Sequence, residues 1–199
     1  MAGENPKFSD KKIIGVDLDG VVCNLWDPFR QQVLMRTGID LPRDIPAYNP
    51  EECSKLTREQ MENIFREGRT MYMNLPEIAR AKSALRSLKN RYRIHIITHR
   101  DFYKGIQKDT LRWLKKHGIP YDKITFTGLD KTREVLDAGC GYMIEDCGEV
   151  AIKLAKKRQK VILLDRSYNK SFNHRLISRV KSWDEIISML GLDNSPDMW

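Results

Sequence analysis

The sequence predicts an α/β fold in which a parallel sheet is covered by helices on both faces. Short apolar segments alternate with helical segments along most of the chain, which is the arrangement typical of parallel sheets. The first apolar run, Ile13–Val16, is continuous, as expected of a strand buried on both faces. A chain of 199 residues suffices for one domain with a modest insertion and for a core without disulfides.

The first half of the chain is predicted to hold one strand followed by three helices. Each helix has a local signal: apolar residues at helical spacing ended by Gly38, a capping box at Thr57–Gln60, and Pro76 near a helix start. The predicted elements are a strand over 12–17 and helices over 26–37, 57–67 and 77–90.

In the second half, strands and helices alternate regularly. A second capping box, Ser182–Glu185, opens the last helix. We predict strands over 92–98, 123–127, 142–145 and 161–164, and helices over 104–117, 131–138, 149–157 and 182–190.

Residues 24–83 interrupt this alternation directly after the first strand. An insertion at that point would stand over the carboxyl end of the strand, where it could act as a lid. We therefore predict a core domain formed by residues 1–23 and 84–199, and a small helical cap formed by residues 24–83.

The composition favours anionic partners. Lys and Arg outnumber Asp and Glu by 35 to 27, a formal net charge of +8. However, the densest basic clusters, at 115–116 and 156–160, fall at the ends of predicted helices, where cations complement the helix dipole. A small phosphorylated molecule is therefore the expected partner, and nucleic acid is an alternative that the charge distribution does not favour. A homodimer is compatible with the sequence.

The spacing of the cysteines and the distribution of apolar residues indicate the cellular compartment of the protein. Cys23, Cys53, Cys140 and Cys147 include no C-x-x-C pair, which argues against a zinc site and a disulfide framework. The first ten residues are polar, and no stretch approaches the length that spans a membrane. We expect a soluble, cytoplasmic protein with no membrane partner.

Two carboxylates, Asp17 and Asp19, follow the first strand directly, and Gly20 then allows a sharp turn. In open α/β sheets, ligands bind at the carboxyl ends of the strands. Carboxylates this close repel each other unless a cation lies between them or one takes a proton. The pattern predicts a magnesium site combined with an acid or base, although Asp-x-Asp-Gly also occurs in calcium loops and ordinary turns.

Further polar residues follow the other predicted strands, and in a parallel sheet these positions share one edge. Carboxylates for a divalent ion, with a hydroxyl and a lysine for phosphate oxygens, together indicate a phosphoryl-transfer site. Taken singly, each has an ordinary alternative as a strand-end cap, a surface lysine or a pair of turn acids. The residues are Thr98, His99 and Arg100 after the second strand, Lys131 after the third, Glu145 and Asp146 after the fourth, and Asp165 and Arg166 after the fifth.

Four segments at these positions resemble, in order, the four motifs of the haloacid dehalogenase (HAD) superfamily of phosphatases. They are Asp17–Val22, Ile96–Thr98, Leu129–Thr132 and Ile144–Asp146. The resemblance covers nearly the whole chain and implies a HAD-like Rossmannoid three-layer sandwich with a small helical cap after the first strand. The insertion, the Asp130–Thr132 triplet and the segments 163–169 and 180–183 more narrowly resemble the 5′(3′)-deoxyribonucleotidase family and related bacterial nucleotidases.

The resemblance implies a role for each motif residue. Asp17 would be the nucleophile that forms an aspartyl-phosphate, and Asp19 would act as the acid and then the base. Thr98 and Lys131 would hold the phosphoryl oxygens. Mg²⁺ would be bound by Asp17, the backbone carbonyl of Asp19 and Asp146, with Glu145 orienting a ligand or Lys131. Glu145–Asp146 stands where many members carry two aspartates.

Substrate contacts are expected from the cap and from the second strand end. Trp26 and Phe29 are predicted to be core residues, whereas Tyr48 and Tyr72 lie near loops and could contact the substrate. His99 and Arg100 could contact phosphate or sugar. His99 stands where the resemblance implies a small hydroxyl residue.

The leading hypothesis is a Mg²⁺-dependent, nucleotidase-like phosphomonoesterase that acts on nucleoside monophosphates or similar small phosphate esters. Alternatives are a phosphatase of sugar phosphates or of nucleic-acid 3′ or 5′ ends, and a non-catalytic binding protein on the same fold. Because both a nucleophile and an acid are present, the non-catalytic alternative is disfavoured.

Overall fold

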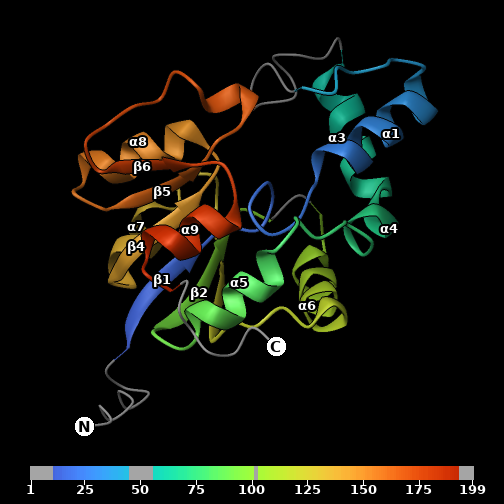
Figure 1. The fold of residues 1–199 in the computed structure, drawn as a ribbon. Coiled ribbons are helices and arrows are strands. Elements are labelled where there is room, and N and C mark those ends of the chain that lie inside the picture. The colour runs from blue at the N-terminus through green and yellow to red at the C-terminus, as the bar shows by residue number, and fades with distance from the viewer. Residues whose placement is uncertain (1–10, 45–55, 101–102, 193–199) are drawn as a thin grey trace, which may run out of the picture.

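The computed structural model describes residues 11–44, 56–100 and 103–192, and it has the predicted α/β architecture (Figure 1). Six parallel strands form one sheet in the order β3-β2-β1-β4-β5-β6. The strands are β1 (Lys12–Val16), β2 (Tyr92–Thr98), β3 (Lys123–Phe126), β4 (Cys140–Glu145), β5 (Val161–Leu164) and β6 (Ile177–Val180). The α-helices in the described residues are α1 (Trp26–Thr37), α3 (Arg58–Glu67), α4 (Arg69–Tyr72), α5 (Ala81–Leu88), α6 (Ile106–His117), α7 (Thr132–Asp137), α8 (Gly148–Lys156) and α9 (Trp183–Met189). The loop after β5 contains a short 3₁₀ helix, η2 (Ser167–Asn169).

Alternate strand residues enter two separate hydrophobic clusters, one on each face of the sheet. In β5, Ile162 and Leu164 join the larger cluster with residues of α5, α6 and α9, whereas Val161 and Leu163 join the smaller cluster with residues of α7 and α8. Since side chains point to opposite faces along a strand, both faces of β5 are apolar and covered. The fold is the three-layer sandwich that the alternating pattern predicted.

Several local predictions are confirmed at the residue level. The predicted helix over 26–37 matches α1, which Gly38 ends in a left-handed conformation (φ +72°). The capping box at α3 is formed, because the Thr57 hydroxyl accepts from the Gln60 amide and the Gln60 side chain accepts from the Thr57 amide. At α9 only half of the predicted capping box forms, because the Ser182 hydroxyl accepts from the Glu185 amide but the Glu185 carboxylate accepts from the Lys181 amide.

The predicted helix over 77–90 is wrong at its start, because α5 begins only at Ala81. The preceding residues instead run along the loop that follows β1. The Asn24 amide donates to the Pro76 carbonyl, and the Ile78 amide donates to the Val22 carbonyl, each at 2.9 Å. These backbone bonds between segments far apart in the sequence override the helix-start signal of the proline.

The sixth strand, β6, was not predicted. It pairs only with β5 in the described sheet and is its edge strand. Three of its four side chains are partly or fully exposed, so it lacks the continuous apolar run that identified the inner strands.

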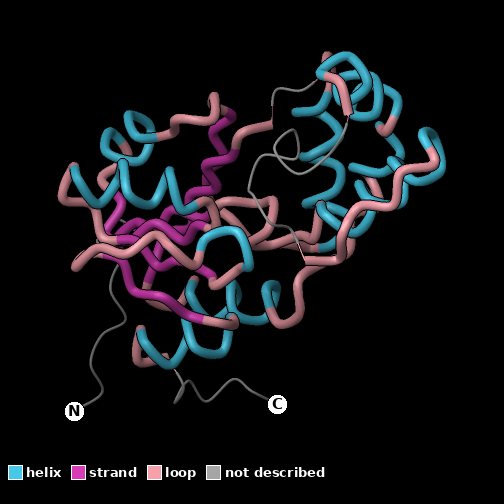
Figure 2. The backbone as a smooth tube through the Cα atoms, turned by 90° about the horizontal axis from the view of Figure 1, so that it is seen from above, coloured by secondary structure: helices cyan, strands magenta, loops and turns pink. Residues whose placement is uncertain are grey.

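Helices α1, α3 and α4 lie together to one side of the sheet (Figures 1 and 2). Helix α4 packs against α6, and Arg69 of α4 makes a bidentate ion pair with the buried carboxylate of Asp109 in α6. The predicted domain boundary at residue 83 falls inside α5, which contacts β2 and α9 rather than this helical group. The division into core and cap stays a prediction.

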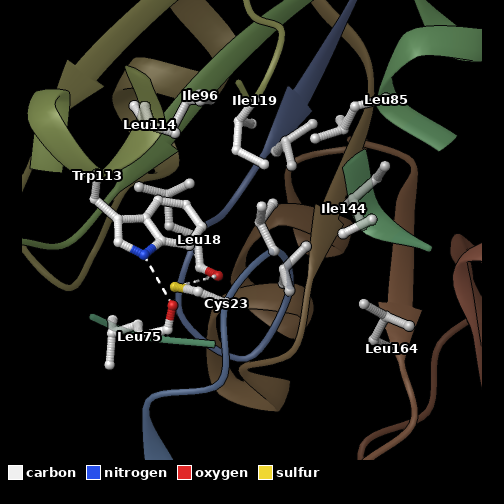
Figure 3. Close-up of a cluster of buried hydrophobic side chains, with 14 of the residues drawn as sticks. Leu18, Cys23, Leu75, Leu85, Ile96, Trp113, Leu114, Ile119, Ile144 and Leu164 are labelled. Carbon is white, nitrogen blue, oxygen red and sulfur yellow. Dashed lines mark hydrogen bonds between the residues drawn. The ribbon is translucent and has the colours of Figure 1, made fainter. Parts of the chain in front are cut away.

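A buried cluster joins the two ends of the inserted region to the sheet (Figure 3). The Trp113 indole N–H donates to the Leu75 carbonyl at 2.9 Å, and the Cys23 thiol donates to the Leu18 carbonyl at 3.4 Å. The chain leaves the sheet through residues 18–23 and returns through Leu75. Both passages are therefore held in the apolar core.

The described cysteines, Cys23, Cys140 and Cys147, are buried free thiols, and Cys53 lies outside the described residues. Among the described helices, none has both the length and the apolar content needed to cross a bilayer.

The buried histidine of β2 makes stability depend on pH. His95 lies 2.8 Å from the Thr125 hydroxyl, and burial, with the charges of Lys123 and Arg93, lowers the pKa of His95 to about 4. The unfolded chain, with an ordinary histidine pKa near about 6.5, then binds more protons between these values, so this histidine makes stability fall as pH drops from about 6.5 towards 4.

Replacing His95 by Gln keeps a hydrogen-bonding side chain that does not titrate. We expect the difference in unfolding free energy between wild type and His95→Gln to change by roughly 3 kcal/mol between about pH 7 and pH 4, in the direction that penalises wild type at low pH. Urea titrations at several pH values measure it. A difference that does not vary with pH would show that His95 takes up its proton equally in both states.

Candidate active site

The polar residues identified in the sequence gather where β1, β2 and β4 end. Asp17 directly follows β1, and its amide donates to the Ile144 carbonyl of β4 at 3.0 Å. Val16 is in register with Ile96 of β2 and with Ile144 of β4. The positions just beyond these three neighbouring strands therefore share one edge of the sheet, as the parallel topology requires.

A buried ammonium group bridges two of the strand-end carboxylates. Lys131, at the start of α7, places its Nζ 2.9 Å from Asp17 Oδ1 and 3.0 Å from Glu145 Oε2. All three side chains are almost fully buried. Glu145 is held further by the amides of Asp146 and Cys147, which both donate to its Oε1 at 3.1 Å. The orientation of Lys131 is thus set from two strands at once.

Burial dominates the proton equilibria of the carboxylates. It raises the pKa of Asp17 to about 7, against the opposing effect of Lys131. Burial also raises the pKa of Asp146 to about 6, with the Asp17 carboxylate adding to the effect, and it raises the pKa of Glu145 although Lys131 opposes this. For Lys131, burial lowers the pKa, but Asp17 and Glu145 outweigh it and raise the pKa above the usual lysine range.

The cluster has the chemistry of a site for a hard divalent cation. One carboxylate oxygen from each of Asp17, Glu145 and Asp146 lies within 4.8 Å of the others. Asp146 Oδ1 is buried, and it makes no hydrogen bond to the residues that the structure describes. The Lys131 ammonium group contacts only Asp17 and Glu145 of these three carboxylates, so a divalent cation would offset negative charge that remains in the cluster. The residues present therefore fit the metal that the motifs imply.

Asp146 is held by a loop that follows β5. The Tyr168 hydroxyl donates to Asp146 Oδ2, and the Asn169 side-chain amide donates to the Asp146 carbonyl at 2.7 Å. Arg166 donates to the Gly20 carbonyl at 2.6 Å. The sequence places Arg166 at this edge and includes Tyr168 and Asn169 in the segment 163–169 that carries the family resemblance, but it assigns none of the three a role. Their position directly after a predicted strand was the available signal.

Asp19 pairs with Arg100 rather than with Lys131. Its two oxygens accept from Arg100, Oδ2 from Nε at 2.9 Å and Oδ1 from Nη2 at 2.6 Å. The Arg100 side chain is fully buried, so in this arrangement its guanidinium faces Asp19 rather than solvent. The predicted contribution of the Asp19 backbone carbonyl to a metal site stays a prediction.

The remaining candidates differ in their access to the site. Thr98 ends β2 and is buried, and its hydroxyl has no hydrogen-bond partner among the described residues, as suits a group that receives a ligand oxygen. His99 is partly exposed. Tyr72 is buried, and Arg100 lies over its ring at 5.8 Å from the centroid. Tyr48 lies outside the described residues, and the substrate contacts predicted for these residues stay predictions.

The arrangement can support transfer of a phosphoryl group. Asp17 is shared by the contact with the Lys131 ammonium group and by the candidate cation site, and the buried Thr98 hydroxyl ends the neighbouring strand β2. These are the groups that stabilise charge on a transferring phosphoryl group.

The chain is similar in sequence to nucleotidases. Residues 11–194 match the family model described as 5′ nucleotidase, deoxy (pyrimidine), cytosolic type C protein. A Chlorobaculum tepidum protein named as a candidate 5′(3′)-deoxyribonucleotidase is 28% identical over 189 residues, 89% of each chain. A Clostridium acetobutylicum protein named a nucleotidase is 30% identical over 110 residues, covering 55% of this chain and 56% of the other.

Solved structures share the fold at low sequence identity. A haloacid dehalogenase-like hydrolase from Streptococcus pneumoniae aligns with a TM-score of 0.65 at 12% identity, covering 92% of this chain and 99% of the other. A HAD family hydrolase from Deinococcus radiodurans, solved with phosphate and sodium, aligns with a TM-score of 0.61 at 15% identity, covering 92% and 97%. The three-layer architecture is therefore that of the HAD superfamily.

Gly20 controls the placement of Asp146. Its φ is +75°, and a Cβ added there would lie 1.7 Å from Asp146 Oδ2, so the carboxylate would have to move. We expect Gly20→Ala to weaken the binding of Mg²⁺ about tenfold or more, because groups that orient metal-binding carboxylates typically change metal affinity by about 10- to 100-fold. Isothermal titration calorimetry measures the affinity.

Gly38→Ala is the matched control for Gly20→Ala. Gly38 has a φ of +72°, but a Cβ added there would meet no atom within 4 Å. Both substitutions should lower stability by about 1 kcal/mol through backbone strain, and Gly38→Ala should leave the affinity for Mg²⁺ intact. Equal affinities in the two variants would mean that contact with Gly20 does not position Asp146.

Proposed function

The chain belongs to the family described as 5′ nucleotidase, deoxy (pyrimidine), cytosolic type C, a family of phosphoric monoester hydrolases, and we propose that it hydrolyses nucleoside monophosphates or similar small phosphate esters with Mg²⁺. The observation that carries the proposal is the buried contact of Lys131 with Asp17 and Glu145, beside Asp146. This contact combines a carboxylate able to attack phosphorus with a cation able to neutralise the phosphoryl oxygens.

The first step is proposed to be phosphoryl transfer to Asp17. An oxygen of Asp17 attacks phosphorus, the bond between phosphorus and the ester oxygen breaks, and Asp19 donates a proton to the departing oxygen. Lys131 and the Thr98 hydroxyl bind the phosphoryl oxygens as negative charge builds on them. The Thr98 hydroxyl, which is buried and has no hydrogen-bond partner within the described ranges, and the fixed Lys131 ammonium support these roles.

The second step returns the enzyme to its starting state. Asp19, now a carboxylate, takes a proton from a water molecule whose oxygen attacks the aspartyl-phosphate. The bond between phosphorus and the Asp17 oxygen breaks, which releases inorganic phosphate and restores the Asp17 carboxylate. Bound Mg²⁺, held by carboxylates of Asp17 and Asp146 with Glu145 close by, would supply further positive charge to the phosphoryl oxygens.

Removing the nucleophile tests the mechanism. We expect Asp17→Asn to lower kcat by at least about 10³-fold, because the neutral amide cannot form the phosphoenzyme. The variant should stay folded, since an uncharged side chain loses no solvation energy at this buried position. Activity is measured with Mg²⁺ on deoxyribonucleotides, ribonucleotides, sugar phosphates and 3′-phosphorylated oligonucleotides, and unfolding is followed by circular dichroism.

Asp130→Asn is the matched control, because Asp130 precedes Lys131 but is exposed and pairs only with the surface residue Lys153 among the described basic residues. It should keep wild-type turnover. Near-normal turnover in Asp17→Asn would contradict the covalent mechanism. Full wild-type activity after thorough removal of divalent ions with EDTA would contradict the metal requirement. Preference within the panel for oligonucleotides or sugar phosphates would replace the proposed substrate class without changing the roles of Asp17 and Lys131.

A further inference from the structure

We propose that Arg100 is a positioning residue that orients the acid/base Asp19 for proton transfer to the leaving group, and that it does not bind the substrate. The proposal rests on the role given to Asp19 in the proposed function. It differs from the sequence-based expectation, which placed Arg100 among the residues that contact phosphate or sugar.

The hydrogen-bonding capacity of Arg100 is almost fully used inside the protein. Its guanidinium donates from Nε and Nη2 to the two oxygens of Asp19, from Nη2 to the Cys23 sulfur at 3.1 Å, and from Nη1 to the Thr110 hydroxyl at 3.2 Å. An arginine has five N–H donors. The side chain is also fully buried, so little of it remains to meet an incoming phosphate.

The guanidinium is held in place by three separate parts of the chain. Thr110 belongs to α6, and its hydroxyl in turn donates to the Ile106 carbonyl at 2.8 Å. Cys23 lies in the loop that follows β1 and is anchored in the core (Figure 3). Tyr72 of α4 supplies a ring face 5.8 Å from the guanidinium carbon. The Arg100 guanidinium therefore has a fixed position, unlike that of a mobile surface arginine.

The Asp19 carboxylate needs a partner that fixes its orientation. It stands in a turn after β1, and its side chain is 16% exposed, whereas Asp17 is confined by burial and by Lys131. A bidentate pair sets the plane as well as the position of a carboxylate. A general acid must lie within hydrogen-bond reach of the departing oxygen. Loss of Arg100 should therefore reduce proton donation while the phosphate-binding groups Thr98 and Lys131 stay in place.

The test compares a leaving group that needs a proton with one that does not. The leaving group of a nucleoside 5′-monophosphate is the nucleoside, which needs a proton because it would otherwise depart as an unstable alkoxide. The leaving group of p-nitrophenyl phosphate is p-nitrophenolate, which is stable without a proton. For Arg100→Met we expect kcat/KM for the nucleotide to fall about 10²-fold or more, and kcat/KM for p-nitrophenyl phosphate to fall less than about threefold. The constant kcat/KM reports only the steps up to release of the leaving group, so slow hydrolysis of the phosphoenzyme does not obscure the comparison. The quantity compared between variants is kcat/KM for the nucleotide divided by kcat/KM for p-nitrophenyl phosphate, called the substrate ratio below.

Three further variants complete the design. Arg100→Lys keeps one charged contact and should give a substrate ratio between those of wild type and Arg100→Met. Thr110→Val removes the Nη1 acceptor without touching Asp19, and it should shift the ratio in the same direction by a smaller factor, which keeps the test decisive if Arg100→Met does not fold. Arg69→Met removes the other bidentate arginine–carboxylate pair of this region, with Asp109, and should leave the ratio unchanged.

Two results would overturn the proposal. Equal losses on both substrates in the Arg100 variants would indicate a general structural role. A rise in KM for both substrates with kcat preserved would indicate a phosphate contact.

If wild type hydrolyses p-nitrophenyl phosphate and glycerol 3-phosphate but no nucleotide, the proposed substrate class fails by itself, and the leaving-group comparison is made with glycerol 3-phosphate.

Discussion

The site depends on the pairing of one buried ammonium group with two buried carboxylates. Lys131 contacts both Asp17 and Glu145, and none of the three side chains has appreciable access to water. An isolated charge in such a place would cost several kcal/mol. Contact with Lys131 offsets part of this cost for both carboxylates, although burial still raises the pKa of Asp17 to about 7. The pairing therefore requires the ends of β1 and β4 and the start of α7 to meet at one point. The fold and the chemistry share this constraint.

The rest of the architecture positions the residues around Lys131, Asp17 and Glu145. The parallel sheet brings β1, β2 and β4 side by side, so that each contributes its last residues to the same edge. Covered faces exclude water from the strands, which is why burial dominates the pKa values of Asp17 and Asp146. The loop after β5 then fixes Asp146 through Tyr168 and Asn169. Asp19, by contrast, belongs to a second network centred on Arg100.

Much of this arrangement could be predicted from the sequence because its signals are local. A continuous apolar run ended by polar residues identifies a buried strand and the residues at its carboxyl end, and this placed Asp17, Thr98 and Asp146 at the edge where the structure has them. The capping boxes at Thr57 and Ser182 identified helix starts for the same reason. Parallel topology then gave the shared edge without any knowledge of the contacts.

What could not be predicted depends on partners that are distant in the sequence. The pairing of Arg100 with Asp19 joins residues 81 positions apart, and nothing in the neighbourhood of Arg100 distinguishes it from a residue that binds phosphate. The segment after Pro76 is extended because it bonds to the loop after β1, and β6 is an edge strand without an apolar run. In each case a tertiary contact, rather than a local preference, decided the outcome.

The most direct test of the central pairing is a double-mutant cycle on the metal-free protein, in which urea unfolding compares wild type, Asp17→Asn, Lys131→Met and the double variant. If the two groups stabilise each other, Lys131→Met is strongly destabilising alone and less so when Asp17 is already neutral, with a coupling of at least about 1 kcal/mol. Additive effects within about 0.3 kcal/mol would show that Asp17 and Lys131 do not interact energetically, and the account of the site would then be wrong.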